Sequence, residues 1–94
     1  MALQISITQS SGIAVTYWKA SKLHIDTIAC TITAEISGYL AYSNYLSGNS
    51  SVAIMLEILN PSQYETILTS TNMINEFYTQ LSQLPDFTGS TVVP

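Results

Sequence analysis

The sequence predicts a small α+β domain, in which an antiparallel β-sheet carries a C-terminal helix. Apolar and polar residues alternate over 13–42, as in half-buried strands. A second apolar run follows at 52–59, and apolar residues recur at three- and four-residue spacing over about 71–82, which is typical of a helix. A chain of 94 residues buries only roughly 60 to 65% of its unfolded surface, so one modest core is expected. We therefore predict a single domain, 1–94.

The stretch 13–42 is predicted to form one long β-hairpin that turns at Asp26-Thr27. Odd-numbered residues of its first strand are expected to face the core: Ile13, Val15, Tyr17, Leu23 and Ile25. Lys19 and Ser21 interrupt that face, which favours a bulge. The even-numbered residues of the second strand are expected to be buried: Ile28, Cys30, Ile32, Ala34 and Ile36. Gly38, near the end of this strand, indicates a bulge or bend.

Two further strands are predicted outside the hairpin. A short alternation at 3–8 indicates a strand at a sheet edge or at a subunit contact. The run from Val52 to Leu59 is apolar except for Glu57, which favours a central strand covered on both faces. Ser62 and Glu65 then have the spacing of a capping box, so a short helical turn is expected to begin there.

The strongest helix signal lies near the C-terminus, at about 71–82. Its apolar residues share one face: Ile74, Phe77, Tyr78 and Leu81. We expect this helix to lie across the sheet with Phe77 as its main anchor, and to end before Pro85, which lacks a backbone donor. The tail 88–94 is expected to be extended or flexible unless a neighbouring subunit holds it.

Tyrosines gather after the hairpin, where 40–51 reads as a polar loop. Tyr39, Tyr42 and Tyr45 are expected to form an exposed aromatic patch that binds a partner, or else to cover the edge of the core. Trp18 has the outward parity of its strand and joins them as a candidate interface residue. Aromatic side chains are enriched at interfaces because they bury a large area and keep a polar tip.

The sequence shows no set of residues that predicts catalysis or metal binding. His24 is the only histidine and Cys30 the only cysteine, and neither has a second soft ligand at short spacing. Cys30 with His24 as its base is the sharpest catalytic interpretation, but Cys30 shares its parity with four aliphatic residues, where thiols pack as small hydrophobes. Glu35 and Glu57 are the candidate acid–base pair, although strand carboxylates more often keep a face wet and discourage edge pairing.

We therefore expect a protein that is not an enzyme, with no catalytic residues, no cofactor, no metal and no small-molecule substrate. Lys19 and Lys22 are the only strong cations and the net charge is −4, which disfavours nucleic-acid binding because phosphate contacts need cations. No apolar run approaches the roughly 20 residues that span a bilayer, and no signal peptide opens the chain, so neither membrane insertion nor export is expected. Charged residues make up 9%, far below the roughly 25% of an average domain, and such a surface is typical of an oligomer.

Three segments carry a resemblance to a known group of proteins. They are Gly12 followed by TYWKASKLHID (16–26), an alternating strand that ends in SGYL (37–40), and a C-terminal helix that closes in YTQLSQLPDFTGSTVV (78–93). Their order resembles small virion structural proteins encoded by tailed bacteriophages and prophages. The loop after the SGYL segment departs from the pattern, since it is uncharged here where such proteins often carry several Arg and Lys residues.

The resemblance implies a non-enzymatic structural subunit of the tail or fibre region, with other virion proteins and copies of itself as partners. It also implies a location in the virion, reached after assembly in the host cytoplasm. Two alternatives stay open: a head decoration or cement protein, and a non-virion accessory protein that binds a host protein through the loop from Tyr39 to Tyr45.

Overall fold

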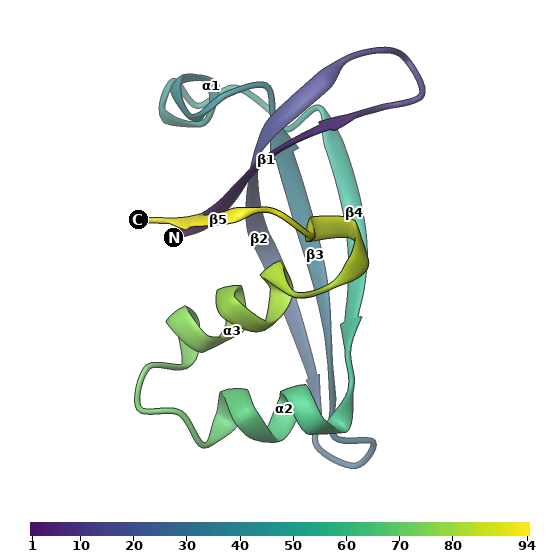
Figure 1. The fold of residues 1–94 in the computed structure, drawn as a ribbon, viewed down its shortest axis with the longest axis vertical. Helices are drawn as coiled ribbons and strands as arrows, with labels where there is room; N and C mark the ends of the chain where they lie inside the picture. The colour runs from purple at the N-terminus through teal and green to yellow at the C-terminus, as the bar shows by residue number, and fades with distance from the viewer.

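The computed structural model describes all residues 1–94. Its elements are β1 (Ala2–Thr8), β2 (Ala14–Asp26), β3 (Thr31–Tyr39), α1 (Tyr42–Leu46), β4 (Ala53–Leu59), α2 (Pro61–Leu68), α3 (Met73–Ser82), the 3-10 turn η1 (Pro85–Phe87) and β5 (Thr91–Val93). The five strands form one antiparallel sheet in the order β4-β3-β2-β1-β5, and α2 and α3 cover one face of it (Figure 1). The predicted α+β class, the long hairpin and the C-terminal helix are confirmed.

A bulge at Ser21 reverses the parity of the β2 side chains relative to β3, and Val15 and Trp18, which differ in parity, both lie in the core before it. The register with β3 shifts between Ala20 and Lys22, and the intervening Ser21 donates a side-chain hydrogen bond of 3.0 Å to the Glu35 carbonyl. An extra residue moves all following side chains to the other face of a strand. The predicted bulge is therefore present, but the single odd-numbered core face is wrong, because the even-numbered Trp18 faces the core before the bulge.

The turn between β2 and β3 is longer than predicted and spans 27–30. The Asp26 carboxylate accepts hydrogen bonds from the backbone N–H groups of Ala29 (2.9 Å) and Ile28 (3.0 Å), and these donors lower the pKa of Asp26. Cys30 adopts a left-handed conformation with φ 55° and is half-buried, while Ile28 is 96% exposed. Both were predicted to be buried, which is wrong because they precede the first paired residue of β3.

One hydrophobic core fills the space between the sheet and the helices. Its members are Leu3, Val15, Trp18, Ile32, Ala34, Ile36, Leu59, Ile67, Phe77, Tyr78, Leu81 and Phe87. Phe77, Tyr78 and Leu81 of α3 lie in this core, whereas Ile74, which was predicted to share their face, is 54% exposed. Trp18 packs its ring edge-on against Phe87, with centroids 5.9 Å apart, and donates its indole N–H to the Ile5 carbonyl at 3.2 Å.

Gly38 lies inside β3 rather than at a bulge or bend, because the register with β4 is regular around it. The indole of Trp18 lies directly against its backbone. A Cβ atom at this position would be 2.6 Å from Trp18 Cζ3 and 2.7 Å from Val15 Cγ1. Glycine is therefore required here for the close approach of the tryptophan ring.

The C-terminal third differs from the sequence prediction in two details. A capping box does open α2, but it joins Asn60 and Gln63, through reciprocal hydrogen bonds of 2.9 and 3.0 Å, rather than Ser62 and Glu65. The tail is extended, as expected, but no neighbouring subunit is needed to hold it, because Thr91–Val93 pairs with β1 of the same chain as β5. The tail therefore closes one edge of the sheet (Figure 1).

Candidate assembly interface

The β4 strand forms the other edge of the sheet and pairs with β3 alone. No backbone hydrogen bond outside the β3–β4 ladder involves residues 53–59. The prediction of a central strand covered on both faces is therefore wrong. Only one side of the apolar run is used in the core, where Leu59 is buried and Ala53 and Met55 pack against it.

The other side of β4 carries three large aliphatic side chains that face solvent. Ile54, Leu56 and Ile58 are 60%, 68% and 66% exposed; we call them the β4 row. They lie on the face of the sheet away from α2 and α3, here called the open face, because they alternate with the core residues of the same strand. An apolar row of this kind on a free edge is a site for contact with another chain.

Polar residues of β2 and β3 border the β4 row on the open face. Lys22, His24, Thr33 and Glu35 line, together with Leu23 and Leu56, a shallow hollow of about 500 Å³. Lys22 is opposite Glu35 in the β2–β3 register, and Glu35 is opposite Leu56 in the β3–β4 register. The open face is thus apolar at its edge and polar at its centre.

The predicted tyrosines gather around a fourth one, Tyr17. The Tyr17 ring centroid lies 5.2 Å from that of Tyr42 and 5.4 Å from that of Tyr45, and Tyr39 and Tyr45 are 5.3 Å apart. The Lys19 ammonium lies 5.3 Å from the centre of the Tyr45 ring, within range of a cation–π contact. Burial raises the pKa of Tyr17. The tyrosines therefore pack on Tyr17, which is not part of the hydrophobic core cluster. Their two expected roles, as a partner site or as a cover for the edge of the core, both stay predictions.

Trp18 is not available as an interface residue. Its side chain is fully buried in the core, on the opposite side of β2 from Tyr17, because consecutive strand residues point to opposite faces. Sequence reasoning placed it outward because it assigned one parity to the whole of β2. Tyr42, which is 51% exposed, is the most accessible member of the tyrosine cluster.

Glu57 points to the core side of β4, opposite Ala34, and not to a solvated face as predicted. Its Oε1 atom is buried and has no hydrogen-bond partner. Burial first, and then the neighbouring Asp86 carboxyl group, raise the pKa of Glu57 from 4.5 to about 7.

We expect Glu57 to make stability fall as pH rises. The folded state raises the pKa of Glu57 from 4.5 to about 7, so its contribution is fully present below pH 4.5 and is lost as pH rises through about 7. After discounting for partial exposure, the loss is about 1–2 kcal/mol. The Glu57→Gln variant cannot ionise, so its free energy of unfolding in urea should fall less than that of the wild type between about pH 5 and about pH 8.

Glu65→Gln, on the exposed surface of α2, is the matched control and should keep the wild-type pH dependence. If the Glu57→Gln variant and the wild type lose the same stability over this range, the raised pKa of Glu57 is contradicted.

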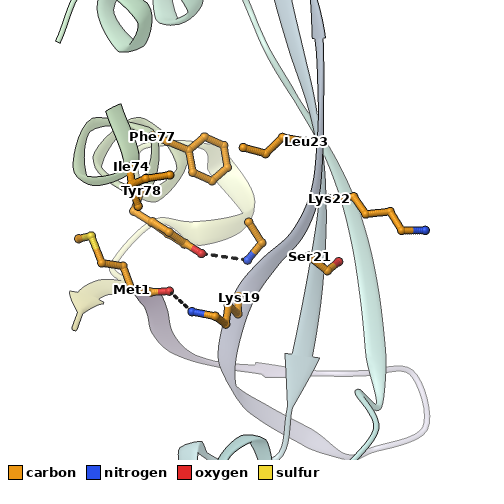
Figure 2. Close-up of a pocket in the computed structure, with 9 residues that line it drawn as sticks. Met1, Lys19, Ser21, Lys22, Leu23, Ile74, Phe77 and Tyr78 are labelled. Atoms are coloured by element: carbon orange, nitrogen blue, oxygen red, sulfur yellow. Dashed lines mark hydrogen bonds between the residues drawn. The ribbon is translucent and has the colours of Figure 1, made fainter. Parts of the chain in front are cut away.

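A separate hollow of about 330 Å³ lies between α3 and the bulged part of β2. Figure 2 shows the Tyr78 hydroxyl, which accepts a hydrogen bond from the Ala20 N–H at 3.1 Å, and the Lys19 ammonium, which donates to the Met1 carbonyl at 2.9 Å. Leu23 and Phe77 point into the hollow, while the Lys22 ammonium points away from it (Figure 2). The Tyr78 hydroxyl and the Lys19 ammonium are thus engaged within the chain.

The residues that were considered for catalysis or metal binding lie apart from this hollow. His24 lines the open face, Cys30 lies in the β2–β3 turn, and neither Glu57 nor Asp86 lines any of the four hollows in the surface. No three His, Cys, Asp or Glu side chains gather as a metal-binding group. None of the helices has the length and apolar character needed to cross a membrane.

Comparison of the chain with protein-family models, with curated proteins and with solved structures finds no match.

Proposed function

We propose that this protein is a non-enzymatic structural subunit that acts through protein–protein contacts in a tailed phage particle, in its tail or fibre region. The observation that carries the proposal is the β4 row: three exposed aliphatic side chains on a strand whose outer edge pairs with nothing. Burial of apolar area is the dominant favourable term in most protein–protein association, so this edge is suited to a neighbouring chain.

The edge also lacks most of the features that keep single sheets apart. Natural edge strands are commonly protected by Lys, Pro or bulges. The β4 strand contains neither Lys nor Pro, and its pairing with β3 has no register shift. Its one protective feature is Glu57, a carboxyl group that points to the core side. A free edge of this composition supports a role in which a partner covers it.

The placement in a phage particle is supported by the resemblance of 16–26, 37–40 and 78–93 to small virion proteins and by the low charge of the surface. Only 9% of residues are charged, so charge repulsion between subunits packed at high density is small. A subunit held permanently among neighbours does not need the charge that keeps free monomers apart.

Mass spectrometry of purified particles tests this proposal. Particles from the phage or induced prophage that encodes the chain would be purified on a density gradient, digested and analysed. We expect peptides of this protein in the particle fractions, at a constant ratio to the other structural proteins. Peptides that occur in the lysate but are absent from the purified particles would overturn the proposed function.

A further inference from the structure

We infer that a second copy of this chain docks on β4, so that the two β4 strands pair edge to edge, antiparallel, about a two-fold axis. The two five-stranded sheets would then form one continuous sheet, with both β4 rows side by side at its centre. This inference rests on the proposed function and specifies the partner and the contact surface.

The sequence of β4 is complementary to itself in this arrangement. With the axis perpendicular to the sheet, opposed residues must lie on the same face, so residues of equal parity face each other. A register centred on Leu56 opposes Leu56 to its own copy and Ile54 to Ile58 of the partner. All seven residues of the strand are then paired, and every pair on the open face is apolar.

The neighbouring registers are less favourable. A register centred on Glu57 would oppose the two Glu57 side chains, and like charges directly opposite are destabilising. A register centred on Met55 would leave Ile58 and Leu59 without a partner residue in β4. The register centred on Leu56 instead places each Glu57 opposite Met55 of the other copy. Charge and overlap therefore select a single register.

The composition of the open face favours edge pairing over stacking of the two open faces. Stacking would bury Lys22, His24 and Glu35, which line the hollow at the centre of that face, and burying charged groups is costly. Edge pairing leaves these residues in solvent and joins only the apolar edges. The resulting contact has an apolar centre and a polar border, which is the usual arrangement of a protein interface. Edge pairing also gives the free backbone groups of β4 hydrogen-bond partners. A strand of an unrelated protein could provide the same hydrogen bonds, but its side chains would not match those of β4.

Disulfide crosslinking tests the contact and its register. Leu56→Cys would be made in a Cys30→Ser background, since Cys30 is the only native thiol. Opposed antiparallel residues have Cα atoms about 4.5–5.5 Å apart, within the range of a disulfide, about 4.4–6.8 Å. Under mild oxidation we expect a covalent dimer on non-reducing gels, formed on the order of tenfold faster than in the matched control, given the pre-organised geometry.

The matched control is Leu46→Cys in the same background, because Leu46 is an equally exposed leucine on α1, outside β4. A mixture of Ile54→Cys and Ile58→Cys proteins should also form the mixed dimer faster than either forms its own dimer. Circular dichroism would confirm that each variant keeps the fold. Leu56→Cys crosslinking no faster than Leu46→Cys would overturn the inference.

The two proposals fail separately. A protein that is present in particles but does not crosslink through position 56 keeps the proposed function and loses the edge pairing. A protein that crosslinks through position 56 but is absent from purified particles keeps the edge pairing and loses the phage function.

Discussion

Replacement of Trp18 by alanine is expected to lower the free energy of unfolding by about 3–5 kcal/mol, the usual cost of truncating a buried aromatic residue. The side chain is fully buried, packs edge-on against Phe87 and donates its indole N–H to the Ile5 carbonyl. A domain of this size has a total stability of only about 5–14 kcal/mol, so the variant should unfold at a much lower urea concentration. Unfolding should be compared at one fixed protein concentration, because oligomerisation shifts apparent stability.

Tyr42→Ala is the comparison for this prediction. It also removes an aromatic ring, but one that is half exposed on α1, so its loss of stability should be well below that of Trp18→Ala. Equal losses for the two variants would contradict the placement of Trp18 at the centre of the core.

Gly38→Ala is expected to destabilise the protein by about 1–3 kcal/mol, the typical cost of overpacking a core. Its added Cβ would be 2.6 Å from Trp18 Cζ3 and 2.7 Å from Val15 Cγ1, so the ring or the strand must move. The free energy of unfolding in urea, measured on the purified variant, checks the prediction.

A double variant isolates this contact. Trp18→Phe removes the outer ring of the indole, so Gly38→Ala should cost less in the Trp18→Phe background than in the wild type, and the two losses should not add. Strictly additive losses would show that the cost of the alanine does not come from the indole ring, and the proposed reason for the glycine would be wrong.

Periodicity was sufficient to predict the hairpin and the C-terminal helix, because β3 and α3 each bury one regular face. It failed within β2, where the bulge at Ser21 reverses the alternation and exchanges the roles of Tyr17 and Trp18. Which residues of β2 face the core cannot be read from this strand alone, since both its odd-numbered and its even-numbered positions contain apolar residues. The cross-strand partners, Gly38 for Trp18 and Tyr39 for Tyr17, reveal it only once the register with β3 is known.

The β4 strand was predicted to be covered on both faces, and the single chain covers only one. A continuous apolar run indicates that both sides avoid water, but it does not say which chain provides the cover. The edge position of β4 depends on strand order, which local sequence does not determine. The absence of Lys and Pro between Ala53 and Leu59 was the one local signal of an edge that can pair. Glu57 obscured this signal, because a charged residue on a strand usually discourages edge pairing.

The mass of the wild-type protein in solution shows whether two chains pair through β4. Sedimentation equilibrium should give a mass that rises with concentration to twice the 10.2 kDa of the chain, while Leu56→Lys, which places a charge at the centre of the paired edges, should stay at 10.2 kDa. A wild-type mass of 10.2 kDa at all concentrations up to about 1 mM, where even a contact of about −4 kcal/mol is detectable, would contradict pairing through β4.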